Sequence, residues 1–353
     1  MIKNIFLGGL QAEALYVGSS LAWIKPYNPS ELFKAGQQGT LYNYFDIENL
    51  FQDTAGTTPV TVNGDPVGLV LDNSGNGINA TQSVSSKRMV YKTSPPSLYL
   101  DKVDDELIIN VPAGGWVGTM VLATVNGTAS YGVNIPAGDY KLGGQYFSSS
   151  NIVGALFRDG ALTDIEKSDV EGYFVDNGAL ASYGGVVSFD MAWRDFTAIT
   201  DFPLIDTSSG ISFSRAWYYC SSLTSFPLID TSSGTDFIYT WDKCSSLTSF
   251  PLIDLSSGNN FYRAWHYCSS LTSFPENAFD NIKGGNFLYA FYNTNLNQES
   301  IDGILVSLVT SGISTGTRRF SQSGGSAPSV GTGQPAIDTL RSRGWDITVT
   351  GRY

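Results

Sequence analysis

The stretch CSSLTSFPLIDTSSG, residues 220–234, decides the fold, because the chain writes all fifteen residues again from Cys244 with one change and begins them a third time at Cys268. The copies are therefore 24 residues apart. Aromatic residues keep this step in three sets: Phe189, Phe213, Phe237 and Phe261; Trp193, Trp217, Trp241 and Trp265; Phe202, Phe226, Phe250 and Phe274. A fifth copy, with Phe287 and Phe291, follows a two-residue insertion. A fixed period of this kind predicts a solenoid of the leucine-rich type, with one coil per repeat.

Residues that recur at one position of each coil should stack on one another. We expect Cys220, Cys244 and Cys268 to form a buried ladder, because cysteine packs as a small hydrophobic residue. Three cysteines without a Cys-x-x-Cys pair indicate neither a disulfide framework nor a metal site. The tryptophan column is expected in the core, where stacked rings bury large areas. The alternative is an exposed stripe of tryptophans that stacks on sugars. The strict repetition of the tryptophan column makes this alternative less favoured.

A third column consists of Asp206, Asp230 and Asp254, each of which ends the segment FPLID. Such carboxylates can bind a cation or a substrate. They can also accept hydrogen bonds from the backbone of the following Ser-Ser-Gly turn. We expect the turn, although the sequence leaves cation binding open.

The residues between SSG and Cys change from copy to copy, so the invariant half of each coil is expected to be the scaffold. Tyr, Arg, Asn and Asp are frequent among the changing residues, and these types are enriched in recognition surfaces. Unconstrained drift of surface residues is the alternative. The candidate ligand-binding residues are Arg215, Tyr218, Tyr219, Tyr239, Asp242, Arg263, His266 and Tyr267.

Composition excludes several classes of function. The chain has 20 Lys and Arg against 32 Asp and Glu, and its net charge of −12 disfavours nucleic acids and anionic membranes. No apolar run is long enough to span a bilayer. His266 is the only histidine, and no acid/base pair stands out, so we expect no enzyme, no metal and no cofactor. Abundant glycine and aromatic residues indicate a mainly β protein.

The rest of the chain divides into three further regions. Residues 1–80 begin with two short apolar runs on either side of a Gly/Gln turn, which predict a β-hairpin from Ile5 to Trp23. The first apolar run is too short for a signal peptide. Two short helices are expected after the hairpin, capped by Ser30 and Asp46 and ending at Phe33 and Phe51, and Asn63-Gly64 marks a turn.

Residues 81–182 predict a small antiparallel sandwich, since alternating strands are broken by turns about every ten residues. One helix interrupts it, with Thr163 as its cap, Glu166 as the capping-box partner and Asn177-Gly178 as its end. The solenoid occupies residues 183–297. Residues 298–353 predict two helices, the first capped near Asn297, and a final strand, which together form an α/β cap on the last coil.

The unit Cys-Ser-Ser-Leu-Thr-Ser-Phe, with its following aspartate, turn and Phe-x-x-Ala-Trp, resembles the BspA-like leucine-rich repeats of bacterial surface proteins and bacteriophage structural proteins. The usual unit has Met-x-x-Met-Phe where this chain has Phe213–Trp217. The ending GGSAPSVGTGQPAIDTLRSRGWDITVTG looks like the cap that follows such repeats in phage proteins. The segment ELFKAGQQGTLYNYFDIENLFQDTAGTTPVT is similar to an N-terminal segment of phage virion proteins, and residues 81–182 resemble a concanavalin-like or laminin-G-like sandwich.

This resemblance implies a bacteriophage tail-fibre or receptor-binding protein in the virion, at the tail or outer surface of the particle and assembled in the host cytoplasm. Residues 1–80 would attach to other virion proteins, and the repeats would recognise a host-surface polysaccharide or protein. Fibre families further imply a homo-oligomer, with a trimer expected. The alternatives are a head fibre or capsid-decoration protein without a receptor and, least favoured, a capsule depolymerase.

Overall fold

The computed structural model describes residues 2–7, 10–17, 20–25, 27–101, 104–125, 127–143, 151–177, 179 and 188–351. The chain forms two compact units, residues 1–144 with 149–183 and residues 145–148 with 184–353. The predicted start of the repeats at residue 183 therefore coincides with a boundary between units. The described elements are mainly strands, as predicted, with three α-helices and three short 3₁₀ helices among them.

The N-terminal residues form an antiparallel sheet of their own, made of β1 (Ile2–Leu7), β2 (Leu10–Val17) and β3 (Ser20–Lys25). Leu7 is opposite Leu10 in the first pairing, and Glu13 is opposite Lys25 in the second. The hairpin predicted from Ile5 to Trp23 is thus present, with a third strand added.

Both short helices predicted after this sheet are 3₁₀ helices of about one turn. The first, η1 (Pro29–Phe33), is capped by Asn28 and not by Ser30, because the Asn28 side chain accepts a hydrogen bond from the Ser30 N–H. The second, η2 (Ile47–Asn49), has the predicted cap at Asp46. It ends before Phe51, because Leu50 and Phe51 pair with the next strand.

The remainder of the first unit consists of two antiparallel sheets. In one, the strand order is β13 (Gly138–Gly143), β10 (Glu106–Val111), β7 (Ala80–Thr81), β6 (Leu69–Val70) and β5 (Leu50–Phe51). The other has β12 (Gly127–Ile135), β11 (Trp116–Thr124), β14 (Ile152–Asp159), β9 (Pro96–Tyr99) and β8 (Val90–Thr93), and β4 (Gly39–Asn43) also pairs with β14. A 3₁₀ turn, η3 (Ser85–Lys87), precedes β8. Tyr140 of β13 contacts Phe157 of β14 edge-on at 5.7 Å, so the two sheets pack against each other.

The boundary predicted at residue 80 is wrong, because it falls inside β7. Strands β4 to β7 join the same two sheets as the strands that follow them. All five residues of β4 are buried, and a strand that buries both faces needs sheet neighbours and covering layers. Residues 27–80 are therefore part of the core of the first unit and do not form a domain separate from the strands that follow.

The helix of this unit, α1 (Asp164–Asp176), begins with the predicted capping box. The Thr163 hydroxyl accepts from the Glu166 N–H, and the Glu166 carboxylate accepts from the Thr163 N–H at 2.8 Å. Val170 and Phe174 bury the inner side of the helix in a cluster with Leu156.

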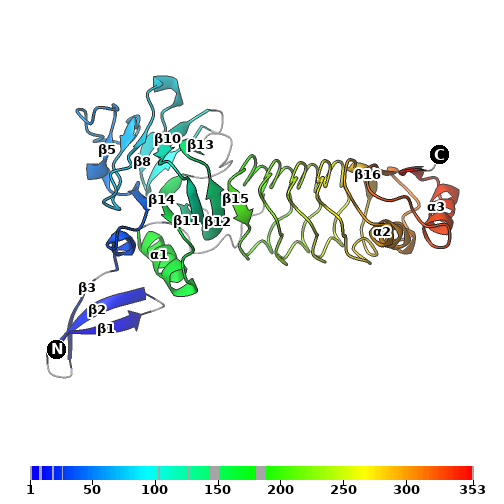
Figure 1. The fold of residues 1–353 in the computed structure, drawn as a ribbon, viewed down its shortest axis with the longest axis horizontal. Coiled ribbons are helices and arrows are strands. Elements are labelled where there is room, and N and C mark those ends of the chain that lie inside the picture. Colours follow the sequence, from blue (N-terminus) through cyan, green and yellow to red (C-terminus); the bar gives the residue numbers. More distant parts are fainter. Residues whose placement is uncertain are drawn as a thin grey trace. The chain divides into compact units, whose positions relative to one another are not determined.

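The repeats follow one another as stacked coils, drawn from β15 (Ile199–Asp201) to β16 (Gly285–Phe291) in Figure 1. Each coil donates backbone hydrogen bonds to the next: the Phe213 N–H to the Asp236 carbonyl and the Phe237 N–H to the Asn260 carbonyl, both at 2.9 Å. These bonds align residues one period apart, as in the paired positions Ser212 and Asp236, so identical side chains lie over one another. The Phe213 and Phe237 rings stack at 5.5 Å.

The predicted tryptophan core is confirmed, since Trp193, Trp217, Trp241 and Trp265 are buried. Trp217 lies parallel to Trp241 at 5.7 Å, and Phe226 contacts Trp217 edge-on at 4.8 Å. The rings thus alternate between stacked contacts along a column and edge-on contacts across the coil, the two favoured aromatic geometries.

The predicted helices and strand at the end of the chain are α2 (Gln298–Thr310), α3 (Gly333–Ser342) and β18 (Asp346–Thr348). Asn297 caps α2 as predicted. Strand β17 (Arg318–Gln322) lies between β16 and β18, and all three are parallel. Ser300 of α2 accepts the Phe274 N–H at 2.9 Å, and Phe320 contacts Phe291 at 5.9 Å, so this segment covers the last coil. No helix in the described part of the chain is long and apolar enough to cross a membrane.

Candidate functional site

The candidate site is the half-coil that changes between repeats, and its backbone is more constrained than the sequence indicates. Arg215 and Tyr219 lie in one coil, and their N–H groups donate to the carbonyls of Ile238 and Asp242 in the next coil, both at 2.8 Å. Both residues have left-handed backbone, with φ of 54° and 62°. The same two positions are left-handed in all five coils: Met191, Arg215, Tyr239, Arg263 and Tyr289; Asp195, Tyr219, Lys243, Tyr267 and Asn293. A side chain with a Cβ ordinarily avoids this region, so the ladder of hydrogen bonds imposes it.

Six of the eight predicted ligand-binding residues are at least partly accessible. Tyr219 and Tyr267 are 43% and 42% exposed. Arg215, Tyr218, Tyr239 and Arg263 are half-buried. The structure brings these six side chains together on successive coils, where a ligand can contact more than one coil.

The prediction is wrong for Asp242 and His266, which are only 1% and 7% exposed. They face each other across two coils, with His266 Nδ1 and Asp242 Oδ1 at 3.0 Å. Tyr267 covers the His266 ring at 4.5 Å and Tyr292 covers it at 5.5 Å. This pair fastens adjacent coils, and a ligand cannot reach it without displacing the tyrosines.

Cations and tyrosine rings alternate along this surface. The guanidinium carbon of Arg215 lies 4.9 Å from the centroid of the Tyr239 ring, and that of Arg263 lies 5.5 Å from the same ring. One tyrosine is therefore flanked by two arginines from the coils before and after it. Lys243 Nζ lies 5.4 Å from the Tyr218 ring and 5.3 Å from the Tyr219 ring. Contacts of this kind hold the long side chains in place.

Five further residues belong to the same surface and were not among the predicted ligand-binding residues: Arg194, Lys243, Tyr262, Tyr289 and Tyr292. The guanidinium carbon of Arg194 lies 5.4 Å from the centroid of the Tyr218 ring. Tyr262 and Tyr289 contact the Arg263 guanidinium at 5.5 and 5.3 Å. Continuing the register across the two-residue insertion would have placed Tyr289 in the column of Arg263 and Tyr292 in that of His266. We call the surface the tyrosine–cation face and define it as Arg194, Arg215, Tyr218, Tyr219, Tyr239, Lys243, Tyr262, Arg263, Tyr267, Tyr289 and Tyr292.

The aspartate column serves the turns, as expected. Asp206 Oδ1 accepts from the Ser208 hydroxyl at 2.7 Å, and Asp230 Oδ1 accepts from Ser232 at the same distance. These hydrogen bonds lower the pKa of both carboxyl groups. Asp254 accepts the Ser256 N–H at 2.8 Å. Each carboxylate is thus used by its own turn.

The cysteine ladder is also confirmed. Cys220, Cys244 and Cys268 are free and fully buried. Each thiol donates to the tryptophan carbonyl of the preceding coil at 3.1 Å. Burial raises the pKa of all three thiols, which disfavours the reactive thiolate.

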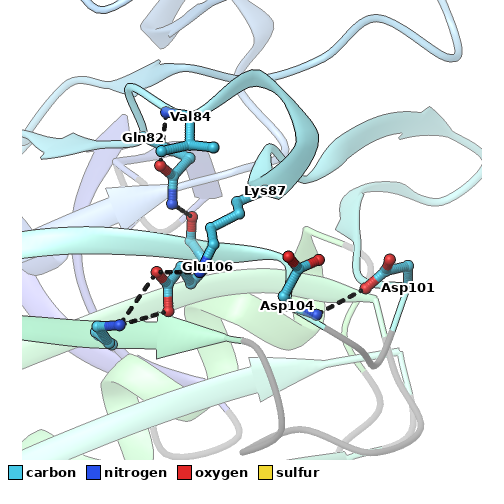
Figure 2. Close-up of polar contacts among 7 residues, drawn as sticks. Gln82, Val84, Lys87, Asp101, Asp104 and Glu106 are labelled. Atoms are coloured by element: carbon cyan, nitrogen blue, oxygen red, sulfur yellow. Dashed lines mark hydrogen bonds and ion pairs between the residues drawn. The ribbon is translucent and has the colours of Figure 1, made fainter.

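The first unit contains a group of carboxylates that the sequence analysis did not single out. Asp101, Asp104 and Asp105 each place a carboxylate oxygen within 4.8 Å of the other two. Asp105 accepts the Asp101 N–H at 2.7 Å, and Asp101 accepts the Asp104 N–H at 3.3 Å, the latter drawn in Figure 2. The Asp101 and Asp105 carboxylates are engaged by these bonds, and we assign no ligand to the cluster. The neighbouring Glu106 is held by Lys87 and by Lys141 at 3.2 Å.

Two surface hollows lie outside the tyrosine–cation face. One of about 590 Å³ is lined by Leu252, Asp254 and Lys283, and one of about 460 Å³ is lined by Glu276, Glu299 and Asp302. Neither contains a predicted ligand-binding residue. Comparison of the chain with protein-family models, curated proteins and solved structures finds no match.

Proposed function

We propose that this chain is a bacteriophage virion protein, a tail fibre or receptor-binding protein, whose repeats recognise a host-surface glycan or protein through the tyrosine–cation face. One observation supports this most directly. Tyrosines and cations that differ between coils are gathered on one surface, where the rings lie partly exposed beside the cations, while the repeated phenylalanine, tryptophan and cysteine columns are buried.

Ligand recognition accounts for the clustering of tyrosines and cations on one surface better than unconstrained drift of surface residues does. Tyrosine and arginine supply large, flat contact areas and directional hydrogen bonds at a modest cost in conformational entropy. On a surface under no selection, large aromatic residues are scattered singly. Here Tyr218 and Tyr219 are adjacent in one coil, and Tyr239 and Tyr262 contact each other edge-on at 5.3 Å in the next two.

The finer assignment of the architecture belongs to the same proposal. We assign the coils to the BspA-like leucine-rich repeats and the two sheets of the first unit to a small concanavalin-like or laminin-G-like sandwich. The regular period, the buried phenylalanine and leucine columns and the helical segment over the last coil support the first assignment. A fibre of this kind acts as a homo-oligomer, and we propose a trimer.

Paired measurements of host-cell adsorption and thermal unfolding test the function. Tyr219→Ala combined with Tyr267→Ala should lower adsorption strongly, because a single anchor that is a hot spot contributes about 2 kcal/mol or more to binding. The same change should alter the free energy of unfolding by only about 0.5 kcal/mol per site. Leu247→Ala is the matched scaffold variant: Leu247 is fully buried, and its truncation should cost about 2–5 kcal/mol of stability. Unchanged adsorption in the tyrosine variant would contradict the proposal.

Attachment to the particle is tested by deleting residues 1–25. Strands β1 to β3 pair only with one another among the described strands, and a small sheet needs a packing partner to be stable in water. We therefore propose that they complete a structure with another subunit or another virion protein. The shortened chain should stay folded and soluble but should no longer enter particles. Normal incorporation would show that attachment lies elsewhere.

A further inference from the structure

The cations of the repeats are concentrated on one surface of an acidic protein. Residues 188–297 contain five Lys or Arg residues, and four of them, Arg194, Arg215, Lys243 and Arg263, lie on the tyrosine–cation face. The whole chain has a net charge of −12. Their concentration beside tyrosine rings, on a chain this acidic, calls for an explanation.

Among the described residues, three of the four cations form no ion pair, although Lys243 donates a hydrogen bond to the Tyr218 hydroxyl at 3.2 Å. Arg194 pairs with Asp195 at 3.0 Å. Among the described residues, no carboxylate forms an ion pair with Arg215, Lys243 or Arg263. Asp242, the sequence neighbour of Lys243, is already engaged by His266.

Arg263 is the clearest case. Its guanidinium is surrounded by the rings of Tyr239, Tyr262 and Tyr289 at 5.3–5.5 Å. It donates no side-chain hydrogen bond to a described residue, and its Nε is buried without a partner. A guanidinium has five N–H donors in a planar fork that fits a carboxylate bidentately. The tyrosine rings therefore fix the orientation of the Arg263 guanidinium, while no described residue accepts a hydrogen bond from its N–H groups.

The spacing of these cations suits a polymer with a repeated acidic group. Arg215 and Arg263 stand on either side of Tyr239, two coils apart, and Lys243 lies on the coil between them. Successive coils are separated by about the spacing of the stacked phenylalanine rings, 5.4–5.5 Å. Two guanidinium groups flanking one ring repel each other, and a bound anion would relieve that repulsion.

We infer that the ligand of the tyrosine–cation face is an acidic polysaccharide, whose carboxylate groups bind Arg215, Lys243 and Arg263 while its sugar rings stack on the exposed tyrosines. The inference rests on the proposed function and specifies its ligand. Nucleic acid fits less well, because three free cations are few for a phosphate backbone and the rest of the chain repels it. The exposed rings of Tyr219 and Tyr267 offer faces that a carbohydrate can cover.

The experiment compares the binding of the full chain to polygalacturonate and to the same polymer after carboxyl reduction, which removes the charge and keeps the sugar backbone. Calorimetric titration should show at least about tenfold tighter binding to the acidic polymer, as expected for charge-assisted hydrogen bonds. The double variant Arg215→Gln, Arg263→Gln should lose about tenfold or more, with unchanged thermal unfolding. Lys283→Gln is the matched control: it removes the one cation of the repeats outside this face and should change binding by less than about twofold.

Three results would overturn the inference: no binding to polygalacturonate, equal binding to both polymers, or unchanged affinity in the arginine variant. Displacement of polygalacturonate by a single-stranded oligonucleotide at equal charge would also overturn it, by showing a surface for polyanions in general. The proposed function is judged separately. If neither polymer binds the chain, but the double variant Tyr219→Ala, Tyr267→Ala still lowers host-cell adsorption, receptor recognition stands and only the acidic ligand is excluded.

Discussion

At the scale of single residues, the same backbone positions carry both strain and accessible side chains. Arg215, Tyr219 and their equivalents in the other coils adopt left-handed backbone, which ordinarily favours glycine or asparagine. The N–H groups of Arg215 and Tyr219 are nevertheless bonded to the next coil at 2.8 Å. Retaining large side chains there costs about 1 kcal/mol or more per residue. The proposed ligand binding gives a reason to retain them.

This strain leads to a prediction for Tyr219→Asn. Asparagine tolerates the left-handed region, so the relief of strain should offset the lost contact with Lys243. We expect the free energy of unfolding to stay within about 0.5 kcal/mol of the wild type or to rise, while host adsorption falls. Urea unfolding and an adsorption assay measure the two effects. A loss of stability comparable to that of Leu247→Ala would show that the ring is part of the scaffold.

The cysteine ladder predicts the reactivity of the thiols. Cys220, Cys244 and Cys268 are fully buried, and burial raises their pKa, so neither access nor ionisation favours attack by a thiol reagent. Labelling of the native protein with a maleimide should be slow and should become complete in denaturant. Rapid labelling of all three thiols in the folded chain, or a native disulfide between two of them, would contradict the stacked arrangement.

At the scale of the element, the invariant Ser-Ser-Gly turn is explained by a close contact. A Cβ on Gly234 would lie 2.6 Å from the Phe237 ring and 3.0 Å from the Phe213 ring. The glycine therefore lets the backbone approach two stacked rings. Gly210 does the same in the neighbouring coil, and Gly258 lets the backbone approach the Phe261 ring. The sequence shows that this glycine repeats, and the packing of the coils shows why.

Gly234→Ala should accordingly destabilise the repeats by about 1–3 kcal/mol, the usual cost of overpacking. Gly331→Ala is the control, since a Cβ there meets no atom within 4 Å. Thermal unfolding of both variants decides the matter. Equal stability of the two would mean that the phenylalanine column shifts freely, contrary to the tight stacking at 5.5 Å.

At the scale of the whole molecule, each open end of the coil stack needs a cover. The last coil buries Phe287 and Phe291, and β17 extends the sheet from β16 with parallel pairing. The inner side of α2, including Ile301 and Leu305, is buried against this end. Without the cover, the stack would present a hydrophobic layer and an unpaired strand edge.

We therefore predict that a chain ending at Asn297 aggregates or loses its cooperative unfolding transition, in contrast to the chain that lacks residues 1–25. Size-exclusion chromatography and calorimetry compare the two truncations. A monomeric product with a wild-type melting temperature after the C-terminal truncation would show that the coils need no cover at this end.

The sequence by itself determined the period of 24 residues, the buried Trp and Cys columns, the aspartate turns and the caps at Thr163 and Asn297. These features depend on local hydrogen bonds or on identical residues meeting one period apart, and both can be read from spacing. The position of the varying half-coils on one accessible surface follows from the same period.

Only the tertiary structure decided the features that depend on which different residues meet. Asp242 and His266 are buried because each finds its partner on the adjacent coil, whereas their types alone predicted exposure. Strands β4 to β7 join the sheets of later strands through pairings distant in sequence, so the boundary near residue 80 could not be read locally. The left-handed residues arise from bonds between coils, and the arginines on either side of Tyr239 meet only because stacking brings three coils together.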